Sequence, residues 1–225
     1  MEIVSIFDEK ILLLSPHRDD EVFGCGGLIS CLMCLQKENN LLIYYFTPPM
    51  HPSSLIDNKA WERENNEAIK YMGCQIEFSK EGIINHLDVL PIFKQIKEIE
   101  DILKAFKPNT ILIPFPDYDQ DHERVYKAAL AATRVNDRIP PVNNILLYET
   151  IGATQVYPLF PFDPNMFLPI DIKKKKELCA IYQTQIRKHR NTDTIEKMAM
   201  SRGLQYRHDC SFAEAYMVLR MAIDE

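Results

Sequence analysis

The sequence lacks the features that would place it in a membrane or on a nucleic acid. No apolar stretch among its 225 residues is long enough to cross a bilayer, and the N-terminal residues lack the basic start and long apolar core of a signal peptide. Basic residues do not exceed acidic ones, because 26 lysines and arginines stand against 32 aspartates and glutamates, a net charge of −6. No basic stripe alternates with aromatic residues. We therefore expect a cytoplasmic protein with no membrane span and no DNA or RNA partner.

Cysteine is too sparse for a disulfide framework. Six cysteines in a chain of this length, most of them in apolar surroundings, indicate reduced thiols. Cys31-x-x-Cys34 has the spacing of a zinc or redox motif, but it lies within an expected helix and has no second Cys or His pair nearby, so we interpret it as core packing. The sequence also lacks internal repeats, low-complexity tracts and linkers, which predicts a single domain over residues 1–225.

Short apolar strands alternate with amphipathic helices along the chain. Strands are expected at 11–14, 41–46, 75–78, 110–114 and 143–149, and helices at 28–35, 58–72, 92–106, 125–132, 173–183 and 194–200. Residues 212–219 fit a last strand or helix, and the lysines at 173–176 are interpreted as a solvated helix face. The alternation predicts an α/β protein, which we expect to be a Rossmann-like three-layer fold with a mainly parallel sheet and an elaborated C-terminal part.

A polar turn follows the first strand. Within five residues it carries one imidazole and three carboxylates: His17, Asp19, Asp20 and Glu21. Parallel sheets bind ligands beyond the carboxyl ends of their strands, and a bound cation would relieve the repulsion between carboxylates this close. His17 and Asp20 could supply two ligands to a divalent metal, leaving Asp19 free. Glu21 is expected to cap the helix or to support a ligand.

A second acidic turn repeats this arrangement after a later strand. Residues 115–122 connect the strand that ends at Pro114 to a helix, and they contain Asp117, Asp119, Asp121 and His122. Two such turns converge on one crevice if their strands lie close together in the sheet. The glycines at 24, 26 and 27 do not form a phosphate-binding pattern, and we expect them to allow close helix packing.

Two sequence motifs of this chain resemble a pair of motifs that occur together in a known protein family. They are Pro16-His17-x-Asp19-Asp20-Glu21, followed by a glycine-rich helix start, and Asp121-His122 after a later strand. In these motifs the chain resembles the LmbE-like / PIG-L family of zinc-dependent N-acetylglucosaminyl deacetylases. Weaker matches continue through Tyr148-Glu149-Thr150, residues 164–167, Lys176, residues 182–185, Arg202-Gly203 and residues 212–216. The resemblance implies that His17, Asp20 and His122 bind the metal and that Asp19 is the general base that takes a proton from the metal-bound water.

One departure from the family concerns the proton donor. Members commonly carry a histidine three residues before the final ligand, assigned to stabilising the intermediate or protonating the leaving group, and Asp119 stands there in this chain. An aspartic acid can donate a proton only if its pKa is raised, as burial or neighbouring carboxylates would do. Asp119 is therefore the predicted acid, with His208 or Asp19 as alternatives. We interpret His51, His86 and His189 as surface or loop residues.

Two arginines are candidates for substrate binding. Arg18 stands where the family often has proline, and it could meet a phosphate or carboxylate of the substrate or pair with an acid at the surface. The family usually has an arginine three positions before the glutamate that matches Glu64, but Trp61 occupies that position here. Arg63 is the nearest arginine and is the predicted substitute.

The sequence thus predicts a zinc-dependent N-deacetylase that acts on an N-acetylated sugar or sugar conjugate. Iron(II) stays open as the metal, because a His-Asp-His site suits both ions. One alternative is hydrolysis of another acyl amide, such as a peptide or an antibiotic intermediate. Another is a metal-retaining, catalytically weak protein that binds a small molecule. Nothing in the sequence names the substrate, and a homo-oligomer is left open.

Overall fold

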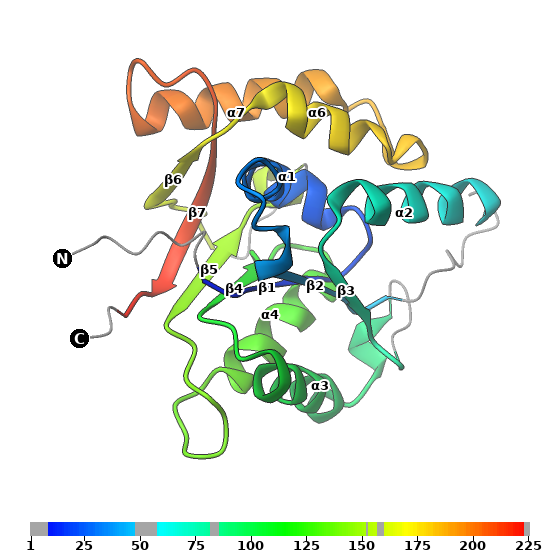
Figure 1. Cartoon of the computed structure of the whole chain (residues 1–225), viewed down its shortest axis with the longest axis vertical. Coiled ribbons are helices and arrows are strands. Elements are labelled where there is room, and N and C mark those ends of the chain that lie inside the picture. The colour runs from blue at the N-terminus through cyan, green and yellow to red at the C-terminus, as the bar shows by residue number, and fades with distance from the viewer. Residues whose placement is uncertain (1–8, 48–57, 82–85, 152, 157–159, 223–225) are drawn as a thin grey trace.

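A seven-stranded sheet runs through the protein in the order β3-β2-β1-β4-β5-β7-β6 (Figure 1). The computed structural model describes residues 9–47, 58–81, 86–151, 153–156 and 160–222. The strands are β1 (Ile11–Ser15), β2 (Leu41–Tyr45), β3 (Gln75–Phe78), β4 (Thr110–Pro114), β5 (Asn144–Tyr148), β6 (Met166–Pro169) and β7 (Ala213–Arg220). β1 to β5 pair in parallel, and β7 is antiparallel to both β5 and β6. The predicted α/β fold with a mainly parallel sheet is confirmed.

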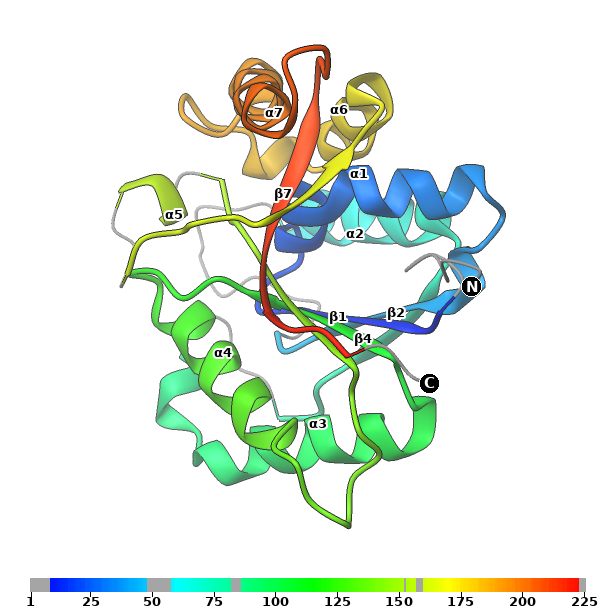
Figure 2. The same cartoon turned by 90° about the vertical axis from the view of Figure 1, so that its left-hand side faces the viewer.

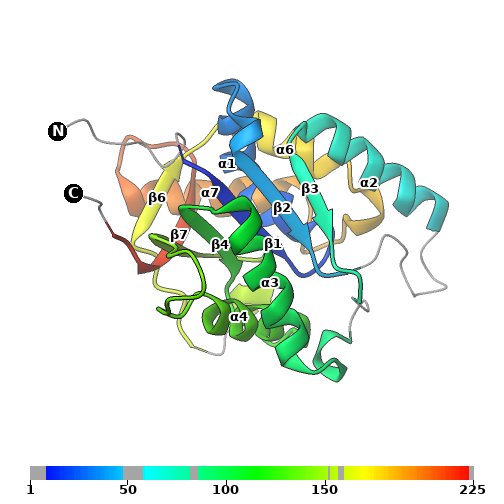
Figure 3. The same ribbon diagram turned by 60° about the horizontal axis from the view of Figure 1, so that its bottom comes forward.

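Helices cover both faces of the sheet (Figure 2). They are α1 (Asp20–Cys34), α2 (Asn58–Met72), α3 (Ile92–Phe106), α4 (Gln120–Ala132), α5 (Ala153–Val156), α6 (Ile172–Ala180) and α7 (Thr192–Tyr206). α1 and α2 lie on one face, and α3 and α4 lie on the other (Figure 3). α6 packs against α1, and α7 packs against α6 and β7. Within the described ranges, none of the helices combines the length and the apolar character that a bilayer crossing requires.

The central strand β1 is buried on both sides. Leu12 and Leu14 belong to the apolar core under α3 and α4, whereas Ile11 and Leu13 belong to the core under α1. Side chains alternate between the two faces of a strand, so a continuous apolar run is what a strand covered on both faces requires.

α1 begins at Asp20, well before the predicted start at residue 28. Its first turn is acidic yet buried, and the apolar helical pattern begins only after a kink at Cys25. The expected close packing of the glycines is confirmed, because a Cβ added to Gly27 would lie 2.4 Å from Ile170 Cγ2. The first turn of α1, which carries Asp20 and Glu21, thus lacks the apolar pattern by which a sequence reveals a helix.

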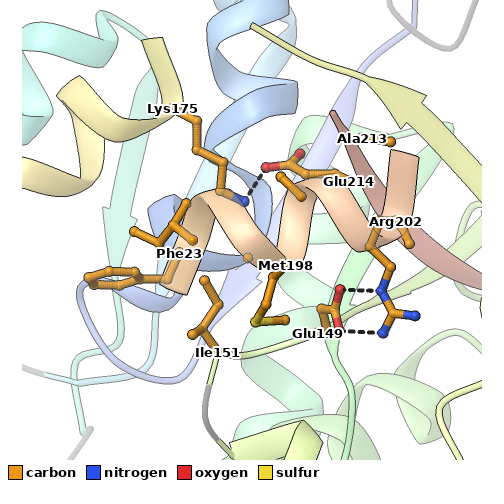
Figure 4. A pocket seen from close by; sticks show the side chains of 12 residues that line it. Phe23, Glu149, Ile151, Lys175, Met198, Arg202, Ala213 and Glu214 are labelled. Atoms are coloured by element: carbon orange, nitrogen blue, oxygen red, sulfur yellow. Dashed lines mark hydrogen bonds and ion pairs between the residues drawn. The ribbon is translucent and has the colours of Figure 1, made fainter. Parts of the chain in front are cut away.

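The interpretation of the lysine run as a solvated face is wrong for Lys175. Lys175 is only 4% exposed, and its Nζ donates to Glu214 Oε1 at 2.6 Å (Figure 4). Glu214, on β7, also accepts from the backbone N–H groups of Gly27 and Leu28 at 2.6 and 2.9 Å. A carboxylate from the C-terminal part therefore fixes α1 just after its kink.

Two further expectations concern the cysteines and the last strand. All six cysteines are free thiols, as expected. Cys34 is the last residue of α1 and is exposed, so the assignment of Cys31-x-x-Cys34 to core packing is wrong for Cys34. Residues 212–219 give the strand β7 rather than a helix, and β6 lies in a proline-rich stretch where no strand was expected.

Candidate metal centre

Two turns leave the sheet next to each other. β1 pairs with β2 on one side and with β4 on the other, both in parallel. Strands are added outward from β1 to β3 in the first half of the chain and outward from β4 to β5 after that, so the order of the strands reverses between β1 and β4. In parallel sheets, ligands bind beyond the carboxyl ends of the strands at such a switch point. The turn after β1 carries His17, Asp19 and Asp20, and the turn after β4 leads into His122 in the first turn of α4.

Asp20 connects the two turns. Its Oδ2 lies 3.2 Å from His17 Nδ1 and 3.3 Å from His122 Nε2. The opposite nitrogen of each ring meets another carboxylate. His17 Nε2 lies 3.1 Å from Asp121 Oδ2, and His122 Nδ1 lies 3.0 Å from Asp117 Oδ2. The two turns converge as expected, and each ring is oriented by an outer carboxylate, an arrangement typical of metal-ligating histidines.

Asp119 adds a further carboxylate. Ligand atoms of His17, Asp119 and His122 lie within 4.8 Å of one another. Asp119 also caps α4, because its Oδ1 accepts from the Asp121 N–H at 2.9 Å. We refer to His17, Asp20, Asp119 and His122 as the metal-centre residues. They offer two imidazole nitrogens and two carboxylates, a donor set that fits zinc or iron(II).

The electrostatics of the cluster favour a bound cation. Burial opposes protonation of His17, but hydrogen bonds to Asp121 and Asp20 raise its pKa to about 10. Burial opposes protonation of His122 as well, yet Asp20 and Asp117 raise its pKa well above the ordinary value. The carboxylates thus hold positive charge at both rings, and a divalent ion can supply that charge in place of the ring protons.

Asp19 stands beside the metal-centre residues in a strained backbone conformation. Its φ is 142°, in the region that favours glycine, and strain of this kind concentrates at functional sites. Its N–H donates to Glu21 Oε2 at 2.8 Å, so Glu21 supports the turn. Its Oδ1 accepts from Arg190 Nη2 at 3.1 Å. Burial raises the pKa of Asp19 to about 6, although Arg190 opposes the rise.

A cavity of about 130 Å³ adjoins the metal-centre residues. Arg187, His189 and Arg190, which follow the helical turn at 183–185, line part of it. His189 is exposed, as expected, but it faces this cavity. No sequence pattern predicts Arg190, because only the fold brings its loop to the turn after β1.

The other predicted residues lie outside this cavity. Arg63 is exposed on α2, and His208 is exposed between α7 and β7. His86 is exposed as expected, and His51 falls outside the described residues. Arg18 is buried at 3% exposure and forms no ion pair within the described part of the chain, so the surface-pairing alternative is wrong. Burial lowers the pKa of its guanidinium.

The comparison with protein families gives one match. A family model described as GlcNAc-PI de-N-acetylase (PIG-L) matches residues 12–133, which is just over half of the chain. No curated protein sequence matches.

Several solved structures share the fold. The conserved protein TT1542 from Thermus thermophilus is 19% identical with a TM-score of 0.76, and the match covers 96% of this chain and 97% of that one. The N,N'-diacetylchitobiose deacetylase from Pyrococcus horikoshii is 19% identical with a TM-score of 0.72, covering 95% and 85%. GalB, the 4-carboxy-2-hydroxymuconate hydratase from Pseudomonas putida KT2440, is 17% identical with a TM-score of 0.75, covering 96% and 98%. At these identities the likeness concerns the fold alone.

Proposed function

Because the chain belongs to the GlcNAc-PI de-N-acetylase (PIG-L) family, we propose that it is a metal-dependent hydrolase that removes the acetyl group from an N-acetylated sugar or sugar conjugate. One observation carries the proposal. Asp20 brings the imidazoles of His17 and His122 to one point, and a separate carboxylate holds the far nitrogen of each ring. Outer carboxylates of this kind orient metal-ligating imidazoles, and a bound metal would take the place of the ring protons.

His17 Nδ1, Asp20 Oδ2 and His122 Nε2 would hold the metal, with Asp119 within reach as a further ligand. Three protein ligands and one open position are usual for a catalytic zinc. A bound divalent ion would supply Lewis-acid activation of water and of the amide carbonyl. Iron(II) is the alternative to zinc, since the donor set suits both.

Asp19 would act as the general base. Its Oδ1 faces Arg190 rather than the two imidazoles, so it is free of the ligand set. A carboxyl group with a pKa of about 6 is mainly ionised at neutral pH and is a stronger base than an ordinary aspartate. Arg190 would hold the carboxylate in position while it takes a proton from the attacking water.

The proton for the leaving amine has two candidate donors. Asp119 is the predicted acid, but it accepts a backbone hydrogen bond at 2.9 Å and lies within ligand distance of both imidazoles, so a role as metal ligand competes with that of acid. Asp19 is the second candidate, because it carries a proton after the first step. The variant Asp119→Asn separates the two roles. Loss of metal would identify a ligand, and retained metal with lost turnover would identify the acid.

Metal content is the first test of the proposed function. Elemental analysis of the wild type and of His122→Ala, purified in parallel, is expected to give about one zinc or iron per chain in the wild type and a loss in the variant. Acetate release from N-acetylated sugars, acylated peptides and antibiotic-type amides then defines the substrate. A wild type that binds no metal after zinc is supplied would refute the proposal.

The alternative to an enzyme is a metal-retaining, catalytically weak protein that binds a small molecule. Metal retention with ligand binding but no turnover across the amide panel would favour a small-molecule-binding protein. The cytoplasmic location and the homo-oligomer stay predictions from the sequence.

A further inference from the structure

Arg18 is a buried cation without a counter-charge. Its exposure is 3%, its Nε is buried without a hydrogen-bond partner, and none of the described carboxylates pairs with it. Other arginines near the site have acids. Arg202 donates to both oxygens of Glu149 at 2.9 and 2.7 Å (Figure 4), and Arg190 pairs with Asp19. A buried charge normally has a partner, so Arg18 is the exception that needs an explanation.

Two aromatic rings fix the guanidinium of Arg18. Its Cζ lies 4.3 Å from the centre of the Phe78 ring and 5.6 Å from that of the Tyr45 ring. The two rings stack on each other at 5.5 Å. Cation–π contacts engage the flat face of a guanidinium, and among the described residues no acceptor bonds its buried Nε. Because Tyr45 ends β2 and Phe78 ends β3, the charge is held beyond the carboxyl ends of these strands.

The negative charge of Glu21 favours the charged form of Arg18, but both carboxylate oxygens of Glu21 are hydrogen-bonded to other groups. Its Oε2 accepts from the Asp19 N–H at 2.8 Å, and its Oε1 accepts from the Tyr182 hydroxyl at 2.9 Å. Glu21 therefore holds the turn after β1 together and does not neutralise Arg18 by direct contact.

We propose that Arg18 binds an anionic group of the substrate, either a carboxylate or a phosphate. This inference rests on the proposed function, because it specifies which class of N-acetylated compound reaches the metal centre. A planar guanidinium matches either anion through two parallel hydrogen bonds. Arg18 directly follows His17, so the guanidinium and the first of the metal-centre residues both extend from the short turn between β1 and α1. The amide of the substrate would lie beyond β1 and β4, and its anion beyond β2 and β3.

The other arginines near the centre offer less to an anion. Arg190 is already neutralised by Asp19. Arg187 is exposed, and its Nη2 lies 3.5 Å from Gln185 Oε1. Pairing with an opposite charge stabilises a solvent-exposed charge only slightly, whereas it stabilises a buried, unpaired charge much more. Of these three arginines, Arg18 is therefore the one expected to gain most from a bound anion.

Calorimetric titration of the purified protein measures this subsite separately from turnover. The probes are N-acetylglucosamine, its 1- and 6-phosphates, and its lactyl ether, which carries a carboxylate. The wild type is expected to bind at least one anionic probe about 10- to 100-fold more tightly than the neutral sugar. The phosphate and carboxylate probes distinguish the two anions.

Three variants assign that preference. Arg18→Met is expected to abolish it while leaving the affinity for the neutral sugar unchanged. Arg18→Lys keeps the charge without the planar fork and is expected to retain a smaller preference. Arg207→Met is the matched control, because Arg207 is exposed, pairs with Asp209 and lies away from the cavity, and it should keep the full preference.

Several results would overturn the proposal. One is a wild type that binds no anionic probe more tightly than the neutral sugar. Another is an Arg18→Met variant that still binds the anionic probe more tightly by the wild-type factor. Unfolding temperatures are measured in parallel, and if Arg18→Met is destabilised by the loss of its contacts with Phe78 and Tyr45, Arg18→Lys, which keeps a cation over the rings, provides the test. Acetate release from the same probes is measured in parallel. An intact anion preference without any turnover supports the subsite and contradicts only the proposed deacetylation.

Discussion

Replacing Asp117 with asparagine is expected to weaken metal binding without unfolding the protein. Asp117 is 1% exposed, and its Oδ2 lies 3.0 Å from His122 Nδ1 and accepts from the Thr150 hydroxyl at 2.8 Å. A carboxylate there requires the proton on Nδ1 and leaves Nε2 free as a ligand. Its Oδ1 accepts from the Asp119 N–H at 2.9 Å. Asparagine can still accept from the Asp119 N–H through its amide oxygen, but its NH₂ group then faces His122 Nδ1. Because an NH₂ group donates, Nδ1 must accept, and the ring proton moves to Nε2, which is the expected ligand atom.

The expected size of the effect follows from the position of Asp117 outside the ligand set. Loss of an outer partner of a ligating histidine typically lowers metal affinity by about 10- to 100-fold, or roughly 1.4–2.7 kcal/mol. Competition against a chelator of known affinity measures this for the wild type and for Asp117→Asn. Asp101→Asn is the matched control, because Asp101 lies exposed on α3 and pairs with Lys97. Unchanged metal affinity in a folded Asp117→Asn protein would refute the assigned tautomer.

Three further predictions concern catalysis and packing. Asp19→Asn should keep the metal and lose at least ~100-fold in turnover, measured by acetate release alongside elemental analysis, and undiminished turnover would remove Asp19 as the base. Lys175→Ala should lower the free energy of unfolding by roughly 3 kcal/mol in a urea titration, because the buried Glu214 carboxylate loses its counter-charge. A change below about 1 kcal/mol there would mean that the other donors to Glu214 suffice. Gly27→Ala should cost about 1–3 kcal/mol, since its Cβ would meet Ile170 Cγ2 at 2.4 Å, and an unaltered thermal unfolding curve would contradict this.

The sequence predicts the central elements and the meeting of the two turns because both depend on local patterns. β1 and β4 are continuous apolar runs, and each is followed at once by acidic residues and a histidine. Parallel strands end at the same edge of a sheet, so adjacency of β1 and β4 was enough to bring His17 and His122 together. The roles assigned to these residues stay predictions.

The parts that the sequence does not predict depend on partners far along the chain. Arg190 reaches Asp19 from a loop with no periodic pattern, and Lys175 lies in a run of lysines yet is buried by Glu214 on β7. Hydropathy alone assigns such charged residues to solvent, because it does not register a distant counter-charge. The start of α1 was missed for the same reason, since the buried Asp20 and its polar neighbours interrupt the apolar pattern.

The place of β7 in the sheet governs when the fold can be completed during synthesis. β7 lies between β5 and β6, so β6 leaves the ribosome before the strand with which it pairs. Until β7 emerges, the Gly27 amide also lacks the Glu214 carboxylate that holds α1 after its kink. Pairing between distant segments is slow, and it exposes unpaired strand edges while it waits. The helix that carries Asp20 therefore reaches its final position only after β7 has been synthesised.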